Sequence, residues 1–357
     1  MTRALSLGSR IGILGGGQLG RMLSVAASRL GYVTHIFDPA EDAPAAHVAA
    51  KHIAASYEDL EALRSFAQAV DVVTYEFENV PTDALDAIEA IVQIHPNRRA
   101  LSTSQDRLTE KEFLKSLDLN VAEFVDITSP LDFGRAETLL SHGAILKTRR
   151  FGYDGKGQVR LSAKDSLEQA WSDLNRAPSV LEALVPFTSE ISVIGARSSD
   201  GQVICYDPGE NTHRNGILHE TVVPAQITST QKTNAVLATA KVLNALEYVG
   251  VMGVEFFVTA NGLLVNEFAP RVHNSGHWTQ QGCAVDQFEQ HIRAIAGLPL
   301  NDARRSSNVT MTNLIGSDIE NLAAHLNDAS SAIHLYGKAE AKPGRKMGHV
   351  NKVTSSA

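Results

Sequence analysis

The sequence KTRRFGYDGKGQ, residues 147–158, decides how this chain is organised. It lies between two apolar runs, Ala144–Lys147 and Val159–Ser162, and therefore predicts a loop that joins two strands. Three glycines at positions 152, 155 and 157 allow the backbone N–H groups of this loop to close around phosphate oxygens. Lys147, at the end of the first strand, adds a fixed cation beside them. Together these features favour a site for a polyphosphate.

The segment after this loop completes a small unit. A helix is expected over Ser166–Asn175 and a strand over Ser179–Leu184, with a boundary near residue 185. Residues 182–185 end that strand, and free backbone groups there could bind the edge of an adenine ring. Glu190, which follows, is placed to accept hydrogen bonds from ribose hydroxyls, and a surface glutamate at a strand end is the alternative.

The first hundred residues alternate strand and helix patterns. The alternating elements are expected at Arg10–Leu14, Gln18–Leu30, Tyr32–Asp38, Leu60–Ala69 and Val70–Tyr75. This order predicts a parallel sheet covered by helices. After Pro96 the pattern changes to a charged helix, Asp106–Leu117, with Ser104 as its expected N-cap. A domain boundary is predicted near residue 104.

A glycine-rich turn follows the first expected strand. Residues 15–20 read GGGQLG, which satisfies the G-x-G-x-x-G pattern of dinucleotide sites, and Asp38 ends the next strand. Physically, the pattern describes a tight turn with N–H groups at a helix N-terminus, which suits an anion. A nicotinamide cofactor, another phosphate-bearing ligand and a purely structural turn all remain open. We expect the second, because the chain carries a separate nucleotide apparatus.

Two carboxylates are expected to face each other in the last third of the chain. Apolar strands at Val251–Thr259 and Leu263–Phe268 are joined around Asn261-Gly262. A two-residue Asn-Gly turn would send Glu255 and Glu267 to opposite faces, whereas a three-residue loop, 260–262, would pair residue 259 with 263 and oppose the two glutamates. Opposed carboxylates need a shared proton or a cation. We predict the three-residue loop and a Mg²⁺ site, since this ion prefers hard oxygen ligands near phosphates.

The segment APRVHNSGH, residues 269–277, directly follows the second of these strands. It gathers an arginine, two histidines and an asparagine within seven residues, which is an unusual composition for a structural loop. Such side chains neutralise anions and hold or move protons. We therefore expect a catalytic loop beside the carboxylate pair.

The composition excludes several classes of protein. A length of 357 residues favours two or three domains, and a net charge of -8 disfavours a general nucleic-acid binder. Two distant cysteines, Cys205 and Cys283, make a disulfide framework or cysteine-based zinc site unexpected. No apolar stretch approaches the roughly 18 residues of a membrane span, and the first ten residues lack a signal-peptide core. We expect a cytoplasmic protein without nucleic-acid or membrane partners.

These motifs together resemble the 5-(carboxyamino)imidazole ribonucleotide synthases, a family of ATP-grasp ligases of purine biosynthesis. The likeness spans nearly the whole chain. Its most specific part is Pro270–Trp278, because other ATP-grasp enzymes share the lysine, loop and glutamates without that string. The resemblance implies an α/β fold in three parts: an N-terminal parallel-sheet domain (1–104), a small ATP lid (105–185) and a larger α+β C-terminal domain (186–357) with the metal and substrate site.

The resemblance also implies roles for individual residues. ATP would be held by Arg107, Lys147, Gly152, Tyr153, Asp154, Gly155, Lys156, Gly157, Gln158, Glu182, Ala183, Leu184, Val185, Glu190, His213, Asn266 and Glu267. The bicarbonate and ribonucleotide sites would be lined by Gln18, Leu19, Glu78, Tyr153, Asp154, Arg271, His273, Asn274, Ser275, Lys338 and Arg345. Mg²⁺ would be bound by Glu255 and Glu267, and the catalytic residues would be Lys147, Arg271, His273 and Asn274.

The implied reaction uses ATP and bicarbonate to carboxylate the exocyclic amine of 5-aminoimidazole ribonucleotide through carboxyphosphate. Its products are 5-(carboxyamino)imidazole ribonucleotide, ADP and phosphate, and the family implies a homodimer. One alternative is another ATP-grasp ligase, such as a formate-dependent glycinamide ribonucleotide transformylase. A second is an NAD-dependent oxidoreductase built on the glycine turn. A third, a non-enzymatic nucleotide sensor, is disfavoured because the lysine, both glutamates and the Arg/His/Asn group are intact.

Overall fold

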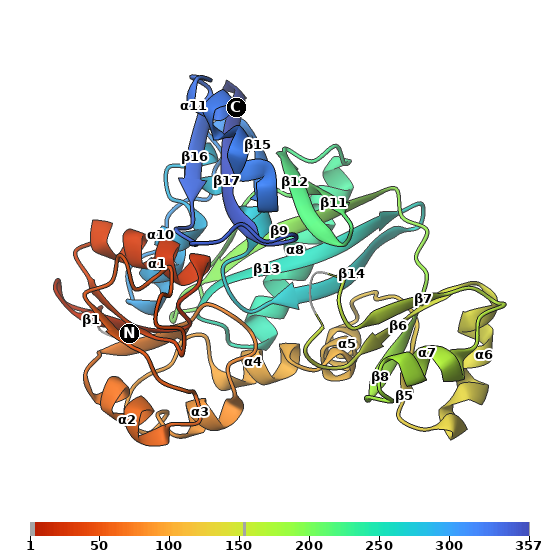
Figure 1. Cartoon of the computed structure of the whole chain (residues 1–357). Coiled ribbons are helices and arrows are strands. Elements are labelled where there is room, and N and C mark those ends of the chain that lie inside the picture. Colours follow the sequence, from red (N-terminus) through yellow and green to blue (C-terminus); the bar gives the residue numbers. More distant parts are fainter. Residues whose placement is uncertain (1–3, 153–154, 357) are drawn as a thin grey trace.

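The computed structural model describes residues 4–152 and 155–356, and its strands form three separate sheets (Figure 1). The N-terminal sheet and the small lid sheet lie on either side of a larger C-terminal sheet. Within the described residues, no helix is both long enough and apolar enough to cross a membrane. The expected domain boundaries near residues 104 and 185 stay predictions.

The N-terminal sheet is parallel, as expected, with strand order β3-β2-β1-β4. Its central strands are apolar and buried because helices cover a parallel sheet on both faces. The short strand β3 lacked a sequence signal. The elements are β1 (Arg10–Leu14), α1 (Gln18–Arg29), β2 (Val33–Phe37), β3 (Lys51–Ile53), α2 (Leu60–Gln68), β4 (Val72–Tyr75) and α3 (Thr82–Asp86).

Two helices connect this domain to the lid, α4 (Arg98–Ser104) and α5 (Arg107–Ser116). The expected N-cap, Ser104, is wrong, because this residue ends α4 and its hydroxyl donates to the Leu101 carbonyl. Asp106 caps α5 instead, and its Oδ1 accepts from Leu108 N at 3.0 Å. A carboxylate cap satisfies N–H groups of the first turn that have no partner within the helix.

The lid is an antiparallel sheet of order β5-β8-β6-β7, with α6 and α7 packed beside it. Its apolar side chains form their own small core around Leu146, Trp171 and Leu181. The glycine-rich loop joins β6 to β7, as the sequence predicts. The elements are β5 (Phe124–Ile127), α6 (Phe133–Ser141), β6 (Ala144–Thr148), β7 (Gln158–Leu161), α7 (Leu167–Asp173) and β8 (Ser179–Ala183).

The C-terminal sheet follows the order β14-β13-β9-β11-β12-β15-β17-β16, and β10 pairs with β9 off this path. Its strands are β9 (Ser189–Arg197), β10 (Val203–Cys205), β11 (Gly209–Arg214), β12 (Ile217–Val223), β13 (Gly250–Thr259), β14 (Gly262–Ala269), β15 (Ser307–Ile315), β16 (Ser331–Leu335) and β17 (Lys346–Ser356). Its helices are α8 (Ser229–Ala245), α9 (Thr279–Gly282), α10 (Gln287–Ile295) and α11 (Leu322–Leu326). Helix α10 packs against both β13 and α1, so it joins this sheet to the N-terminal domain.

Candidate active site

Glu255 and Glu267 are direct partners in the β13–β14 ladder, as predicted. The predicted cause is wrong: Thr259 pairs with Gly262, so the loop has two residues, 260–261. That register alone would set Glu255 opposite Asn266 and turn Glu267 to the other face. A β-bulge between Glu255 and the next pair inserts Asn266 as the extra residue. The bulge therefore brings both carboxylates to one face.

The two carboxylates are electrostatically unequal. Arg107 Nη1 lies 3.0 Å from Glu267 Oε2, and Arg107 and Lys147 outweigh burial and lower the pKa of Glu267. Burial and the charge of Glu267 raise the pKa of Glu255 to about 7. Among the described residues, no group of three or more His, Cys, Asp or Glu side chains could hold a metal ion. A cation at this pair would need phosphate or water oxygens to complete its coordination.

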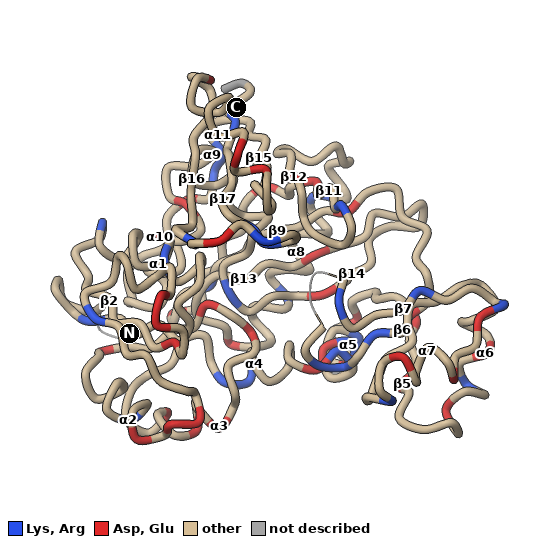
Figure 2. The backbone as a smooth tube through the Cα atoms, viewed as in Figure 1, with Lys and Arg blue, Asp and Glu red and all other residues tan. Residues whose placement is uncertain are grey.

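Lys147 belongs to a buried ionic network that joins the lid to α5. Its Nζ lies 3.0 Å from Glu182 Oε2, and Lys111 Nζ reaches the same oxygen at 3.2 Å. Within the described residues, the other oxygen, Glu182 Oε1, is buried without a hydrogen-bond partner. An unpaired buried acceptor is costly, so this oxygen is suited to a ligand donor such as an exocyclic amine. Charged residues of both signs gather where α5, β14 and the lid meet (Figure 2).

Sequence reasoning missed Glu110 and Lys111, although both are almost fully buried on α5. Glu110 Oε1 accepts from Phe268 N at 2.7 Å and so holds the strand that carries Glu267. Burial and Glu267 raise the pKa of Glu110 to about 8. Two charged neighbours on a helix resemble solvent-exposed positions, so only the packing reveals them.

The glycine-rich loop spans from the lid to the C-terminal sheet. Gly152 O accepts from Arg107 Nη2 at 3.4 Å, and a Cβ on Gly155 would lie 3.6 Å from Gly216 Cα in the β11–β12 turn. Gly152 thus contacts the arginine that pairs with Glu267. The rest of the described loop is Lys156 and Gly157, and Gln158 begins β7. Two residues expected to contact ligands, Tyr153 and Asp154, lie outside the described residues.

The segment that ends β8, residues 182–185 (the hinge), has fewer free backbone N–H groups for a ligand than the sequence suggested. Ala183 N donates to Glu123 O at 2.8 Å and Leu184 N donates to Gly143 O at 3.0 Å. Adenine recognition at this hinge would therefore fall to Val185 and the carbonyl groups. Beyond the hinge, Glu190 Oε2 lies 3.1 Å from His213 Nδ1, so these two expected ATP residues do lie together.

The loop after β14 brings together Arg271 and His273. Arg271 makes a two-point contact with Glu78, including Nη2 to Oε1 at 3.0 Å, which ties this loop to the N-terminal domain. His273 Nε2 lies 3.5 Å from Glu255 Oε1, while its Nδ1 lies 2.8 Å from Ser275 Oγ. Burial and Arg271 lower the pKa of His273 to about 3. Its imidazole is therefore neutral at physiological pH.

Asn274 is held by a second amide. Its Nδ2 donates to Asn313 Oδ1 at 3.0 Å, and Asn313 Nδ2 donates back to Asn274 Oδ1 at 2.7 Å. Ser275, which was expected to contact substrate, is fully buried and accepts from Ser192 Oγ at 2.6 Å. Its hydroxyl also contacts the His273 ring at Nδ1, and its expected contact with substrate stays a prediction.

The glycine turn is occupied by the chain itself. Gly20 N donates to Glu76 Oε2 at 2.7 Å, Gly17 N donates to the other oxygen of Glu76, and Gly16 N donates to Asp38 Oδ2 at 2.7 Å. A Cβ on Gly17 would lie 2.4 Å from Glu76 Oε1. These carboxylates use N–H groups that the pyrophosphate of a dinucleotide would need, which disfavours a nicotinamide cofactor.

Two further expected substrate residues begin α1. Gln18 is half-buried, whereas the side chain of Leu19 is packed in the main apolar core, so only the backbone of Leu19 could meet a ligand. The loop after β16 lies beside this helix, since a Cβ on Gly337 would be 3.5 Å from Arg21 Nη1. That loop carries Lys338, whose Nζ donates to Lys346 O at 2.7 Å, and Arg345, whose Nη1 donates to Glu340 O at 3.1 Å.

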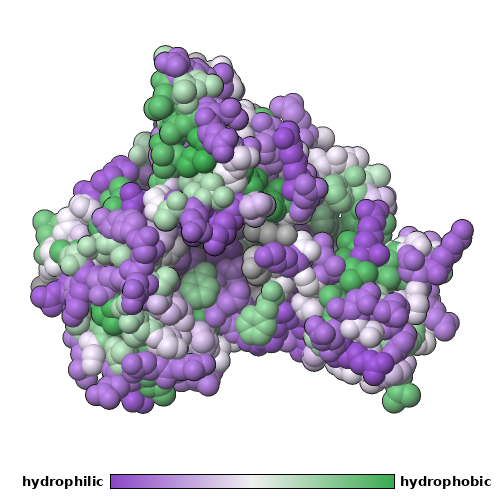
Figure 3. All heavy atoms as spheres, viewed as in Figure 1, coloured by the Kyte–Doolittle hydropathy of each residue, from purple (hydrophilic) through white to green (hydrophobic). Residues whose placement is uncertain are grey.

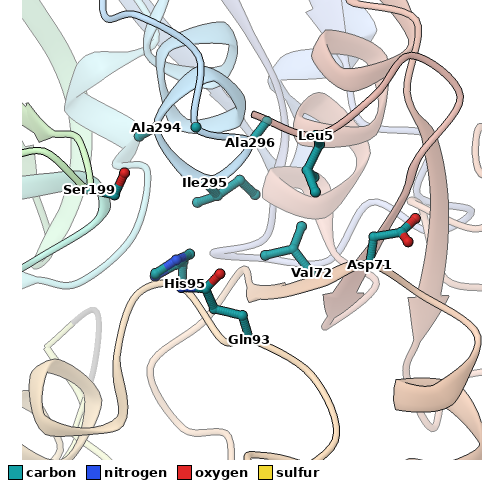
Figure 4. A pocket seen from close by; sticks show the side chains of 10 residues that line it. Leu5, Asp71, Val72, Gln93, His95, Ser199, Ala294, Ile295 and Ala296 are labelled. Atoms are coloured by element: carbon teal, nitrogen blue, oxygen red, sulfur yellow. The ribbon is translucent and has the colours of Figure 1, made fainter. Parts of the chain in front are cut away.

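The surface is hollowed between the three parts of the molecule, and hydrophilic side chains line this hollow (Figure 3). A separate cavity lies behind β4, where Val72, Ile295 and His95 converge (Figure 4). Its volume of about 30 Å³ suits one or two water molecules and is far too small for a nucleotide. This cavity is therefore not the candidate active site.

Three family models match successive parts of the chain. The ribonucleotide synthetase preATP-grasp domain matches residues 9–105, and the ATP-grasp domain matches residues 112–288. The phosphoribosylaminoimidazole carboxylase C-terminal domain matches residues 309–357. The three matches confirm the expected fold.

Proteins of known activity are similar over the full length. An N5-carboxyaminoimidazole ribonucleotide synthase of Brucella melitensis biotype 1 is 50% identical over 353 residues, which cover 98% of each chain. A crystal structure of an N5-carboxyaminoimidazole ribonucleotide synthetase with ADP superimposes with a TM-score of 0.95 at 43% identity, covering 99% of this chain and 94% of that one. A crystal structure of the Aspergillus clavatus enzyme with ADP and 5-aminoimidazole ribonucleotide superimposes with a TM-score of 0.90 at 32% identity. The match covers 98% of this chain and 94% of that one. The chain belongs to the N5-carboxyaminoimidazole ribonucleotide synthase family of ATP-grasp ligases.

Proposed function

We propose that this chain uses ATP and bicarbonate to carboxylate the exocyclic amine of 5-aminoimidazole ribonucleotide. The observation that carries the proposal is that the Glu255–Glu267 pair is contacted from both sides, by Arg107 and the charge of Lys147 at Glu267 and by His273 at Glu255. A similar enzyme binds ADP and this ribonucleotide together, which supports the choice of substrate. A bicarbonate oxygen would attack the γ-phosphorus of ATP and release ADP. The amine would then attack the carboxyl carbon of carboxyphosphate and release phosphate.

Charge neutralisation is the main task in the first step, since bicarbonate and ATP are both anions. Arg107 and Lys147 lie beside Glu267, and Arg271 lies in the adjoining loop. Glu255 and Glu267 fit Mg²⁺ because they are hard oxygen donors that lie directly opposite each other in the β13–β14 ladder. When bound, Mg²⁺ would supply Lewis-acid stabilisation of the phosphate oxygens. Fixed charges aimed at developing charge commonly contribute about 10²–10³ in rate.

His273 would act as a neutral hydrogen-bonding group. With a pKa of about 3 it holds no extra proton at neutral pH, and it is also a weak base. Its Nδ1 is engaged by Ser275, which leaves Nε2, beside Glu255, as the atom that faces the pair. Together with Asn274 it would orient bicarbonate or the attacking amine.

The ribonucleotide would lie against the start of α1. Glu76 already binds two N–H groups of the glycine turn, so the phosphate would be left to the amides of Gln18 and Leu19. Lys338 and Arg345, from the loops beside β16 and β17, would add positive charge. Glu78 would link this site to the carboxylation site through Arg271.

Carboxyphosphate is labile in water, so the site must exclude solvent between the two steps. In the glycine-rich loop, Gly155 lies beside the β11–β12 turn, and Gly152 O accepts a hydrogen bond from Arg107 Nη2. We propose that this loop closes over ATP and keeps carboxyphosphate from hydrolysis until the amine attacks.

Incorporation of isotope tests the reaction directly. Purified protein supplied with Mg-ATP, 5-aminoimidazole ribonucleotide and ¹³C-bicarbonate should form a ¹³C-labelled carboxylated ribonucleotide. NMR of the reaction mixture, recorded without delay, detects this product. Formate-dependent ADP release without such a product would assign the chain to a different ATP-grasp reaction. A homodimer and a cytoplasmic location are further proposals that rest on the family; sedimentation analysis of the purified chain tests the first.

A further inference from the structure

Gln287, the first residue of α10, holds the backbone of His273 at two points. Its Oε1 accepts from His273 N at 2.9 Å and its Nε2 donates to His273 O at 2.7 Å. The side chain is fully buried. A buried amide that pairs with both polar groups of one residue acts as a strand partner would, and it fixes the backbone of that residue.

The same amide also sets the protonation of His277. Gln287 Nε2 lies 3.0 Å from His277 Nδ1. Because the amide nitrogen of Gln287 can only donate, His277 Nδ1 must accept and therefore carries no proton. Gly276 lies between the two histidines, where a Cβ would be 2.6 Å from Gln287 Oε1. Residues 273–277 are therefore wrapped closely around a single side chain.

Helix α10 is in turn anchored to the N-terminal domain. Asp286 and Glu289 contact Arg29 of α1 at 3.3 and 3.1 Å, and His291 Nε2 lies 2.8 Å from Thr74 Oγ1 of β4. Gln287 thus lies on a helix that packs against the N-terminal domain, and its side chain holds the loop that carries His273.

We propose that Gln287 is a positioning residue for carboxyl transfer, which holds His273 and its neighbours in register with Glu255. The inference rests on the proposed function. Gln287 itself lies behind the loop and acts through His273, whose Nε2 is 3.5 Å from Glu255. A displacement of about 1 Å at reacting groups can cost about 10²-fold in rate. Loss of the clamp should therefore slow carboxyl transfer and leave ATP binding, which uses Lys147 and Glu182, unchanged.

The chain provides a matched control on the same helix. Gln290 is also fully buried, and it clamps Asn301 in the same two-point way, with Nε2 donating to Asn301 O at 2.7 Å and Oε1 accepting from Asn301 N at 3.2 Å. Asn301 lies in the connection to β15. Gln290→Leu should therefore reproduce the structural cost of losing a buried amide clamp without moving the site loop.

The experiment measures ADP released per carboxylated product in the full-length enzyme. Gln287→Leu should lower product formation by about 10²-fold, keep the KM for ATP, and release several ADP per product, because carboxyphosphate hydrolyses before transfer. Gln290→Leu should keep the wild-type ratio. Parallel behaviour of the two variants would overturn the proposal and leave Gln287 a structural residue. Failure of the wild type to make product would instead refute the proposed function.

Gln287→Glu covers the case in which the leucine variant does not fold. An ionised glutamate still accepts from His273 N but cannot donate to His273 O, whereas a protonated one regains a donor. The ADP-to-product ratio of this variant should therefore fall towards the wild-type ratio as the pH is lowered from 8 to 6. Gln290→Glu should show no such recovery. A raised ratio for Gln287→Glu that does not fall as the pH is lowered would also overturn the proposal.

Discussion

Glu255 and Glu267 face each other across the β13–β14 ladder, and the guanidinium of Arg107 contacts Glu267 at 3.0 Å. The arginine keeps Glu267 ionised, and the resulting charge, added to burial, raises the pKa of Glu255 to about 7. The pair therefore carries between one and two negative charges at neutral pH. A divalent cation would neutralise that charge.

Binding of Mg²⁺ should release a proton from Glu255. Below pH 7 the proton competes with the ion, so the apparent affinity for Mg²⁺ should rise by up to about tenfold per pH unit from pH 5.5 to 7 and then level off. Calorimetric titration of Mg²⁺ in the presence of a non-hydrolysable ATP analogue measures this slope. Glu255→Gln should bind weakly with little dependence on pH, and a flat wild-type profile would refute the metal assignment.

The pair should also limit stability without its ligands. The folded state raises the pKa of Glu255 above its ordinary value, so ionisation disfavours folding and stability falls as pH rises from 4.5 to about 7. At pH 8 without Mg²⁺ or ATP, Glu255→Gln should gain roughly 1–3 kcal/mol in the free energy of unfolding. Denaturant titration measures it.

Glu267 provides the opposite control for that measurement. Its folded-state pKa is lowered, so its ionised form contributes stability above its ordinary pKa. Glu267→Gln should therefore lose stability at pH 8, because the buried Arg107 loses the negative charge of its carboxylate partner. Shifts of the same sign in the two variants would contradict this account of the pair.

ATP cleavage and ribonucleotide use should separate between two residues. Glu267→Ala should lower ADP formation by at least about 10²–10³-fold, with or without the ribonucleotide. Lys338→Ala should mainly raise the KM for the ribonucleotide and keep basal ATP hydrolysis. Lys342→Ala, in the same loop but exposed and paired with Glu340, should behave as the wild type. Equal losses of basal and ribonucleotide-dependent hydrolysis in Lys338→Ala would refute this division.

The glycine turn should not tolerate a side chain, because the Glu76 carboxylate already fills the space beside it. Gly17→Ala places a Cβ 2.4 Å from Glu76 Oε1, and we expect a loss of about 1–3 kcal/mol in stability. Gly134→Ala, on α6, meets nothing within 4 Å and should be neutral or stabilising by up to about 1 kcal/mol. Thermal unfolding compares them, and a wild-type stability for Gly17→Ala would show that Glu76 does not occupy the turn as described.

Local patterns predicted much of the fold. The N-terminal sheet follows from apolar runs that alternate with helical periodicity, and β1 has the expected bounds. By contrast, the order of the nine-stranded sheet depends on contacts between distant segments, such as β12 with β15, which leave no local signal. The prediction that Glu255 and Glu267 face each other was correct, but its reason was wrong. The bulge at Asn266 that brings them together could not be predicted, because no distinctive residue type marks it.

The candidate site divides in the same way. Lys147 and Arg271 belong to motifs with an unusual composition, so sequence alone could single them out. Glu110, Lys111 and Gln287 could not be found in that way, because ordinary helix residues acquire a role only when the helix packs against the site. Glu76 was also missed, since its partners in the glycine turn lie 56 and 59 residues away.

The central claim is that this chain couples ATP cleavage to carboxylation of the ribonucleotide. The most direct test is ADP release by purified protein with Mg-ATP and bicarbonate, with and without 5-aminoimidazole ribonucleotide. Strong stimulation by the ribonucleotide, lost when bicarbonate is removed, is the expected result. ATP binding without stimulation by that ribonucleotide would contradict the claim, and formate with glycinamide ribonucleotide would be the next substrate pair to test.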